Sequence, residues 1–127
     1  MKPYVAASEQ LVAEIYVRDL ARAREFLIAF GFEVVREEPD FVELRWEQSL
    51  LFLERVENYP EPPPTPVANI RVMVPDVDDY WRKALANGAR VIRPIGDRYY
   101  GLRDFTIAGP DGIALRFATT LAGRGDG

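Results

Sequence analysis

The stretch DRYYGLRDFTIAGPDGIALRFA, residues 97–118, carries the clearest structural signal in this sequence. At its centre, Gly109-Pro110-Asp111-Gly112 combines the residue types that form tight turns. The runs on either side, residues 105–108 and 113–117, are short and mostly apolar, so we predict a β-hairpin. The aromatic and charged loop before it, which contains Tyr99 and Tyr100, either packs its rings on the core or presents them to a ligand.

Upstream of this hairpin, the first half of the chain is predicted to form a strand, a helix and three more strands. Residues 11–17 are an apolar run with β-branched side chains, and Asp19 can cap a helix that begins at Leu20. Apolar residues then recur at helical spacing until Gly31 ends the helix. Strands at residues 32–36, 41–46 and 50–55 complete the order β-α-β-β-β.

The same pattern returns 57 residues later without a gap. Asp19 aligns with Asp76, and Gly31 aligns with Gly88. The apolar strand residues also align: Ile15 with Val72, Val17 with Val74, and Val34 with Val91. Because cap, helix end and apolar phase coincide, we predict a structural duplication. The helices are expected to pack on their sheets through four residues: Phe26, Phe30, Tyr80 and Leu85.

The expected fold is α+β, with two tandem β-α-β-β-β modules forming a cupped mixed sheet. A chain of 127 residues has room for one ordinary domain, residues 1–127. Within it we place module one at residues 11–58 and module two at residues 67–121. The connection, residues 59–66, holds five prolines and should be semi-rigid, whereas residues 122–127 should form a flexible tail.

Composition excludes several classes of function. The chain has no Cys and no His, which removes disulfides, thiolate chemistry, histidine metal ligands and His-containing triads. Its net charge of −4 and scattered basic residues argue against nucleic-acid binding. No apolar run has the length of a signal peptide or a membrane span, so we expect a cytoplasmic protein with no membrane partner.

Several short motifs support a family resemblance. They are V-x-D-L at residues 17–20, F-G-F at 30–32, A-x-G-A at 86–89, and G-L-R-D-F followed by P-D-G within 101–112. In this order, and within the repeat, they resemble the glyoxalase, bleomycin-resistance and extradiol-dioxygenase superfamily, also called vicinal oxygen chelate proteins. The resemblance implies that each module rolls its strands into half of a cup. It also implies that the enzymes place metal ligands, mostly His and Glu, on strand positions that face the cup.

The resemblance maps those metal-ligand positions to Val12, Leu53, Asn69 and Arg116. None is a good metal ligand, and a cationic guanidinium repels a divalent metal, so we expect neither a metal nor another cofactor. Glu54 would need a one-residue register change to enter the cup, whereas Glu14 shares the face of Val12 and could enter directly. Alternatively, Glu14 pairs with Arg71 or Arg116.

Without a metal, the cup becomes a binding pocket. The predicted ligand-binding residues are Glu14, Tyr16, Trp46, Leu53, Asn69, Arg71, Met73, Tyr99, Tyr100 and Arg116. Aromatic platforms with a few charged anchors suit a planar ligand. The pattern is most similar to the non-metal, bleomycin-resistance branch, so we expect a non-catalytic homodimer that sequesters an aromatic, antibiotic-like molecule, such as a peptide antibiotic. The alternatives are a metal-dependent glyoxalase- or dioxygenase-type enzyme and a metabolite-binding accessory domain.

Overall fold

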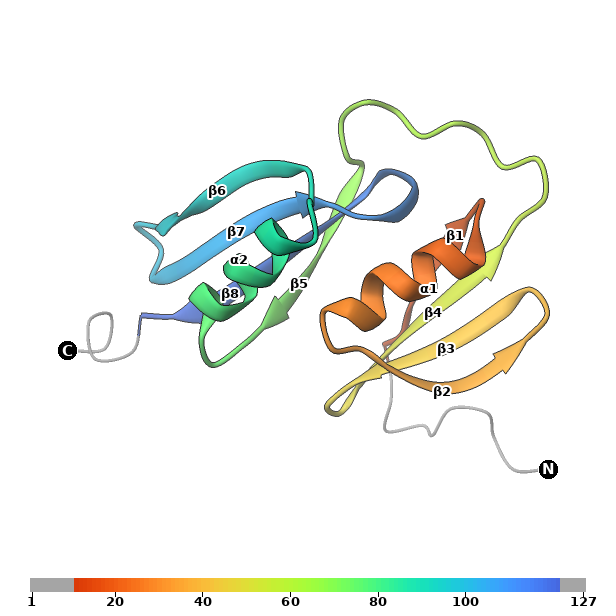
Figure 1. Ribbon diagram of the computed structural model, residues 1–127, viewed down its shortest axis with the longest axis horizontal. Helices are drawn as coiled ribbons and strands as arrows, with labels where there is room; N and C mark the ends of the chain where they lie inside the picture. Colours follow the sequence, from red (N-terminus) through yellow and green to blue (C-terminus); the bar gives the residue numbers. More distant parts are fainter. Residues whose placement is uncertain (1–10, 122–127) are drawn as a thin grey trace. The chain divides into compact units, whose positions relative to one another are not determined.

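The computed structural model describes residues 11–121, which divide into two compact units. Unit 1 extends to Pro60 and unit 2 begins at Glu61, so the segment 61–66 belongs to unit 2. Each unit is one β-α-β-β-β module, a four-stranded mixed sheet with a helix on one face (Figure 1). The α+β class and the tandem modules predicted from the repeat are therefore confirmed.

Unit 1 consists of β1 (Ala13–Val17), α1 (Leu20–Ala29), β2 (Glu33–Glu38), β3 (Phe41–Trp46) and β4 (Ser49–Arg55). The strand order in its sheet is β1-β4-β3-β2. β1 runs parallel to β4, and the other neighbours are antiparallel. This arrangement follows from the chain, because the helix is the crossover that lets β1 pair in parallel with a later strand.

Unit 2 consists of β5 (Ala68–Met73), α2 (Val77–Ala86), β6 (Val91–Asp97), β7 (Leu102–Ala108) and β8 (Ile113–Thr120). A short 3₁₀ turn, η1 (Pro110–Gly112), joins β7 to β8, which confirms the predicted hairpin. The strand order β5-β8-β7-β6, with β5 parallel to β8, reproduces the topology of unit 1 strand by strand.

The ends of both helices follow the sequence signals. The Asp19 side chain accepts a hydrogen bond from the Arg22 amide at 3.1 Å, and the Asp76 side chain accepts one from the Asp78 amide at 3.2 Å. Gly31 has φ +111° and Gly88 has φ +67°, the left-handed conformation that terminates a helix and favours glycine. The predicted caps and helix ends are confirmed in both modules.

The core of each unit lies between its sheet and its helix. In unit 1, Val17, Leu44 and Leu53 of the sheet are buried together with Leu27 of α1. In unit 2, the Tyr80 ring stacks on Phe117 and the Trp81 ring contacts Phe105, each with ring centroids 5.1 Å apart. Full burial of a large apolar side chain such as Leu27 or Phe117 stabilises the folded state by about 1.5–3 kcal/mol relative to leaving it exposed.

The predicted packing residues are right with one exception. Phe30 is buried and contacts Phe26 edge to face, and Tyr80 packs on the sheet. Leu85, however, is 54% exposed. The buried residues of α2 are Val77 and Ala84, which lie two turns apart on one side of the helix. Leu85 directly follows Ala84 and therefore points to a different side, away from the sheet.

Among residues 11–121, no helix is long and apolar enough to span a membrane. The tail predicted at residues 122–127 lies outside the described residues.

Candidate functional site

We call the face of each sheet opposite its helix the open face. In unit 2, Phe105 and Phe117 contact α2, so the alternation of side chains along a strand sends Asp104 and Arg116 to the open face. In unit 1, Leu53 is in register with Ile15 and Val42 in the core, so Phe52 and Glu54 lie on the open face. The residues able to meet a ligand are those on the open faces.

A buried carboxylate lies at the centre of the open face of unit 2. Asp104 is 0% exposed. Its Oδ1 accepts a hydrogen bond from Arg98 Nε at 2.7 Å, and its Oδ2 accepts one from Arg116 Nε at 2.9 Å. The Tyr100 hydroxyl donates to Oδ2 at 3.1 Å. We call these four residues, Arg98, Tyr100, Asp104 and Arg116, the Asp104 cluster.

The charges of the Asp104 cluster fix its protonation state. Burial alone would raise the pKa of Asp104, but the hydrogen bonds from Arg98, Arg116 and Tyr100 outweigh burial and hold that pKa below its ordinary value. The carboxylate is therefore ionised at neutral pH. Two guanidinium groups share one carboxylate, so the cluster retains a net positive charge.

Tyr100 and Arg116 also contact each other. The Arg116 guanidinium lies over the Tyr100 ring, 5.6 Å from its centroid, and Arg116 Nη2 donates to the Tyr100 hydroxyl. Tyr100 remains 42% exposed, and Tyr99, 100% exposed, meets it edge to face. The lead-in loop therefore brings a fixed aromatic ring to the arginine and leaves a second ring fully exposed beside it.

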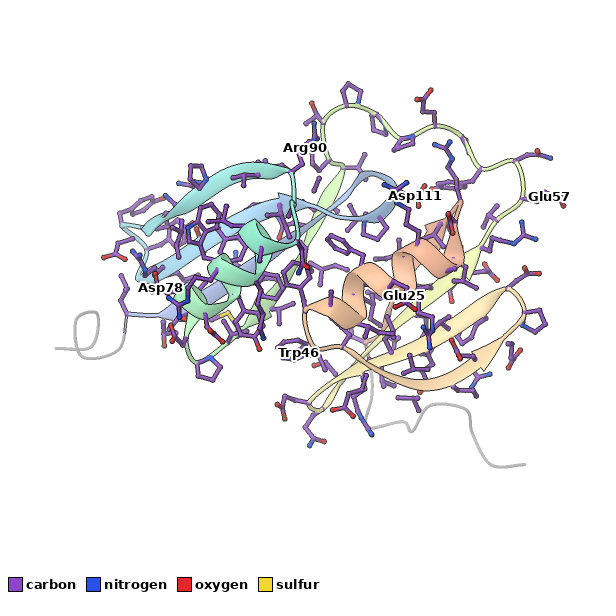
Figure 2. All side chains as sticks on the ribbon, in the orientation of Figure 1. Glu25, Trp46, Glu57, Asp78, Arg90 and Asp111 are labelled. Carbon is purple, nitrogen blue, oxygen red and sulfur yellow. The ribbon has the colours of Figure 1, made fainter. Side chains whose placement is uncertain are left out.

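The adjacent residue of β7, Arg103, forms ion pairs on the helix face. Arg103 Nη2 and Nε donate to the two carboxylate oxygens of Asp78 at 2.9 Å and 3.1 Å, and Nη1 donates to Asp97 at 3.1 Å. The hydrogen bonds from Arg103 lower the pKa of Asp78. Asp78 lies in the first turn of α2 and is labelled in Figure 2, so Arg103 links α2 to β6 and β7.

The predicted site residues on β5 join the open face of unit 2. Asn69, Arg71 and Met73 are exposed and are in register with Ala114, Arg116 and Ala118 of β8. Arg71 and Arg116 are direct cross-strand partners. The structure thus brings together three of the predicted residues, because Arg71 is the cross-strand partner of Arg116 and Arg116 contacts Tyr100.

On the open face of unit 1, Glu14 and Tyr16 are exposed and in register with Phe52 and Glu54. The Tyr16 ring meets Tyr59 edge to face, with centroids 6.0 Å apart. Phe52 meets Phe41 of β3 in the same way at 5.2 Å. This open face therefore combines aromatic rings with carboxylates.

The expected orientations of Leu53 and Glu54 were reversed. Leu53 is 0% exposed in the core, and Glu54 reaches the open face without any register change. The prediction assumed that equivalent positions of β4 and β8 lie the same number of residues after the preceding turn. That assumption fails because the β3–β4 loop has two residues and the β7–β8 loop has four. Glu14 in unit 1 is equivalent to Arg71 in unit 2 by the 57-residue repeat. Glu14 is in register with Phe52, and Arg71 is in register with Arg116, so the counterpart of Arg116 in unit 1 is Phe52.

Trp46 also differs from expectation. Trp46 lies on the helix face of β3, because it continues the alternation that places Val42 and Leu44 there. The centroid of its ring lies 5.1 Å from that of Phe32, and the ring packs over Gly31 (Figure 2). A Cβ added to Gly31 would come 3.3 Å from the Trp46 ring. Trp46 is therefore a core-side residue at the end of α1 and not a platform on the open face.

The partner of Arg116 was missed. The sequence analysis considered Glu14 as its partner, whereas Arg116 pairs with Asp104 inside its own unit. One signal was present, because aspartate is unfavourable within a strand and a carboxylate between two apolar runs requires a cationic partner.

Comparison with known proteins shows the family of this chain. A sequence model of the Glyoxalase/Bleomycin resistance protein/Dioxygenase superfamily matches residues 9–117. The chain belongs to this superfamily. No curated protein matches its sequence closely enough to count as a relative.

Several solved structures share the fold at low sequence identity. TioX from Micromonospora sp. ML1 is 24% identical with a TM-score of 0.73, over 87% of this chain and 98% of that one. A glyoxalase/bleomycin resistance protein/dioxygenase family enzyme from Burkholderia phytofirmans PsJN is 22% identical with a TM-score of 0.74, over 87% and 97%. The bleomycin resistance determinant encoded on the transposon Tn5 is 16% identical with a TM-score of 0.68, over 87% and 97%.

The residues of this superfamily member do not fit the metal site of the superfamily's enzymes. Within the described residues, no group of three or more acidic, His or Cys side chains could hold a metal ion. Val12, Asn69 and Arg116 occupy three of the mapped positions, and the register places Phe52 at the fourth. Aliphatic, amide, cationic and aromatic side chains are a poor ligand set for a divalent metal.

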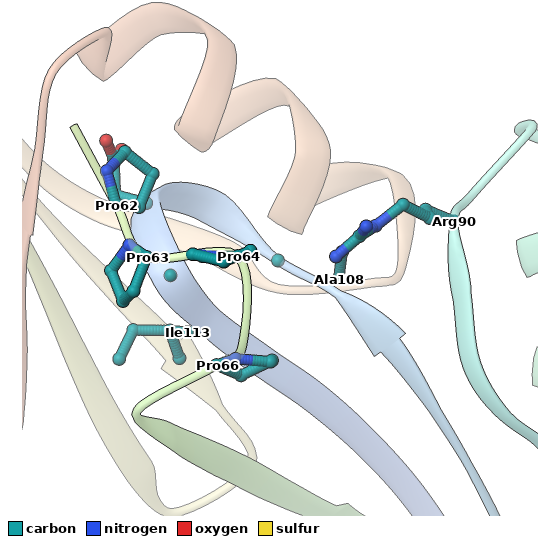
Figure 3. A pocket seen from close by; sticks show the side chains of 10 residues that line it. Pro62, Pro63, Pro64, Pro66, Arg90, Ala108 and Ile113 are labelled. Carbon is teal, nitrogen blue, oxygen red and sulfur yellow. The ribbon is translucent and has the colours of Figure 1, made fainter.

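Unit 2 also has a cavity of about 200 Å³ beside the proline-rich segment (Figure 3). It is lined by Pro62, Pro63, Pro64, Pro66, Arg90, Ala108, Gly109, Asp111, Gly112 and Ile113. None of the predicted ligand-binding residues lines it. The segment lies close against the hairpin turn, because the Val67 amide donates to the Gly112 carbonyl at 3.0 Å and a Cβ on Gly112 would come 3.1 Å from Pro62.

Proposed function

We propose that this superfamily member binds and sequesters a planar aromatic, antibiotic-like small molecule without turning it over, in drug resistance or self-protection. The Asp104 cluster is the observation that carries the proposal. Arg116 occupies the last-strand position at which the superfamily's enzymes hold a metal ligand, and its guanidinium is bound to a buried carboxylate. A fixed cation at that position opposes a divalent metal and orients a ligand instead.

Exposed aromatic rings support binding by stacking. Tyr100 is held by the Asp104 cluster yet partly exposed, and Tyr16 on unit 1 is exposed beside Tyr59. A well-placed ring pair contributes about 0.5–1.5 kcal/mol beyond its buried area. Several such contacts together with apolar burial can reach the roughly 8 kcal/mol of micromolar affinity.

The fold supports the same role. The bleomycin resistance determinant encoded on the transposon Tn5 has this fold, so a resistance function is one that the fold can accommodate. Because sequence identity to it is 16%, the fold is the shared property, and the ligand has to be identified on this chain.

Calorimetric titration of the full chain tests the proposal. The panel contains bleomycin and peptide antibiotics that carry quinoline or quinoxaline rings. We expect at least one to bind with micromolar or better affinity and to raise the melting temperature. Heat is a better readout than intrinsic fluorescence, because both tryptophans pack against core aromatic rings.

Variants locate the binding surface. Tyr100→Ala should weaken binding about tenfold, corresponding to about 1.4 kcal/mol. Leu85→Ala, an exposed change on the outer side of α2, is the matched control and should have no effect. A panel without any binder, together with turnover in the presence of divalent metal, would replace this proposal with an enzymatic one.

One observation favours that enzymatic alternative. Glu14 and Glu54, the two carboxylates considered from the sequence, share the open face of unit 1. Elemental analysis of protein purified without chelator tests this alternative, and stoichiometric Ni, Zn, Fe or Mn would support it.

We further propose that the chain acts as a homodimer, since the superfamily often builds its cups from modules of two chains. Light scattering at micromolar concentration should give twice the mass of the chain. A monomer would contradict the exchange of modules between chains.

A further inference from the structure

A row of arginines crosses the open face of unit 2. Arg71 on β5 is in register with Arg116 on β8, Arg116 with Thr106 on β7, and Thr106 with Arg93 on β6. Cross-strand partners lie about 5 Å apart and point to the same side of a sheet. We call Arg71, Arg116, Thr106 and Arg93 the basic row.

The basic row carries a local charge opposite to that of the whole chain. With Arg98, the open face of unit 2 has four arginines against the single carboxylate of Asp104, within a protein of net charge −4. Arg71 and Arg93 are exposed, and within residues 11–121 neither forms an ion pair. One carboxylate cannot neutralise this face, so it attracts a negative group from solution.

Arg116 is held in a fixed orientation by the Asp104 cluster. Its Nε and Nη2 donate to Asp104 and Tyr100, whereas its Nη1 has no hydrogen-bond acceptor in the described part of the chain. A guanidinium that is already ordered loses little further freedom when it binds a ligand. The neighbouring Arg71 can supply a second set of donors to the same group, and planar guanidinium groups match the two oxygens of a carboxylate.

We infer that the basic row binds the carboxylate of an aromatic acid whose ring stacks on Tyr100. The inference rests on the proposed function and specifies its ligand class, an anion in place of a neutral or cationic molecule. It follows that acidic aromatic compounds bind more tightly than cationic ones such as bleomycin.

Titration of the full chain with a matched pair of probes tests this inference. 2-Naphthoate and 2-naphthamide have the same ring and nearly the same shape, but only the first is charged. Naphthoate should bind about tenfold more tightly than naphthamide, and added salt should reduce the difference because it screens exposed charges.

Arg71→Gln should weaken naphthoate binding about tenfold and leave naphthamide binding unchanged, because only the carboxylate forms a charge-assisted hydrogen bond with the guanidinium. The matched control is Arg82→Gln, which removes the same charge from an exposed position on α2. Because Arg71 is exposed on an edge strand, its replacement should leave the fold intact.

Equal binding of the two probes would overturn the inference, as would an equal loss in Arg71→Gln and Arg82→Gln. If the probes bind equally while the antibiotic panel still binds, the proposed function stands without the anion site. If neither the probes nor the panel bind, both fail. If naphthoate binding depends on Arg71 while the panel fails, the anion site stands and sequestration of antibiotics does not.

Discussion

Units 1 and 2 have the same topology, but the chemistry differs at most equivalent positions in one row across their open faces. In unit 2 the row consists of Arg71, Arg116, Thr106 and Arg93. The equivalent positions in unit 1 hold Glu14, Phe52, Glu43 and Arg36, in the same order. The buried residues of the helix faces, in contrast, are apolar in both units, and charged residues of that face, such as Arg103, are only partly buried. Packing against a helix therefore restricts the buried part of one face to apolar side chains, whereas the other face can take a different chemistry in each unit.

The difference is sharpest at one pair of positions. In unit 1 the pair is Phe41 and Phe52, edge to face at 5.2 Å, with the Arg36 guanidinium 4.8 Å from the Phe41 centroid. In unit 2 the same positions hold Asp104 and Arg116, a buried ion pair. The two units thus stabilise equivalent sites by apolar packing and by charge, and this predicts different responses to mutation and to pH.

Each unit has its own fluorescent reporter for testing this comparison. Trp46 packs on Phe32 in unit 1, and Trp81 packs on Phe105 in unit 2. Trp81→Phe leaves a probe of unit 1 alone, and Trp46→Phe leaves a probe of unit 2 alone.

The largest effect is expected from Phe52→Ala. Removal of a buried ring leaves a cavity and should lower the free energy of unfolding by about 3–5 kcal/mol, equally at neutral and acid pH. Urea unfolding followed by Trp46 measures this loss. Val35→Ala, at an exposed position on β2, should cost less than about 1 kcal/mol, and a similar cost for Phe52→Ala would show that the ring does not support the fold.

A somewhat smaller loss is expected from Asp104→Ala. Without the carboxylate, Arg98 and Arg116 lose their shared partner while each keeps only about 15% of its side chain exposed. Loss of one partner of a buried ion pair should cost about 3 kcal/mol at neutral pH, measured by urea unfolding followed by Trp81. Asp79→Ala removes an exposed ion-pair partner in the same unit and should cost under about 1 kcal/mol. Equal costs would show that the Asp104 cluster adds no more than a surface pair.

The pH dependence should separate the two units. Because the pKa of Asp104 is lowered in the folded state, its ionised form contributes stability above the ordinary value of 3.8. That contribution is lost as pH falls below 3.8 through the lowered folded pKa. Arg98, Arg116 and Tyr100 are the groups that contact the carboxylate.

Acid titration in the two single-tryptophan backgrounds measures this difference. Trp81 should report a loss of stability that Asp104→Asn removes, and the effect of Phe52→Ala in unit 1 should not vary with pH. An acid transition in unit 2 that persists unchanged in Asp104→Asn would assign it to other carboxylates, such as Asp78, whose pKa is also lowered.

The smallest effects should be alike in the two units, because the helix caps are the feature they share. Asp19→Ala and Asp76→Ala should each cost about 1 kcal/mol. Asp19→Asn and Asp76→Asn, which keep an acceptor, should restore most of it. Thermal unfolding measures the cost of both pairs of substitutions. A cost at only one cap would show that the two modules do not depend equally on their helix caps.

Sequence reasoning predicted the features that depend on local signals. Asp19 and Asp76 as caps, Gly31 and Gly88 as helix ends, and the hairpin at residues 109–112 required only residue type and spacing. Their physical causes act over a few residues, so they can be recognised without knowledge of the rest of the fold.

The features that sequence reasoning missed depend on register between distant strands. The error at Leu53 came from unequal loop lengths, and a shift of one residue exchanges the two faces of a strand. The partner of Arg116 lies twelve residues away on a neighbouring strand, and it could be chosen over Glu14 only when the pairing of β7 with β8 was known.

The alternating ion pairs of β7 constrain how this strand can be placed during folding. Arg103 meets Asp78 and Asp97 on one face, and Asp104 meets Arg98 and Arg116 on the other. A slip by one residue in one direction would place Arg103 at the position of Asp104, beside Arg98 and Arg116. A slip in the other direction would place Asp104 at the position of Arg103, beside Asp78 and Asp97, so either slip would replace attractions with a repulsion. Apolar packing penalises such a slip by exposing side chains, and in β7 misaligned charge adds a second penalty that selects a single alignment of the strand.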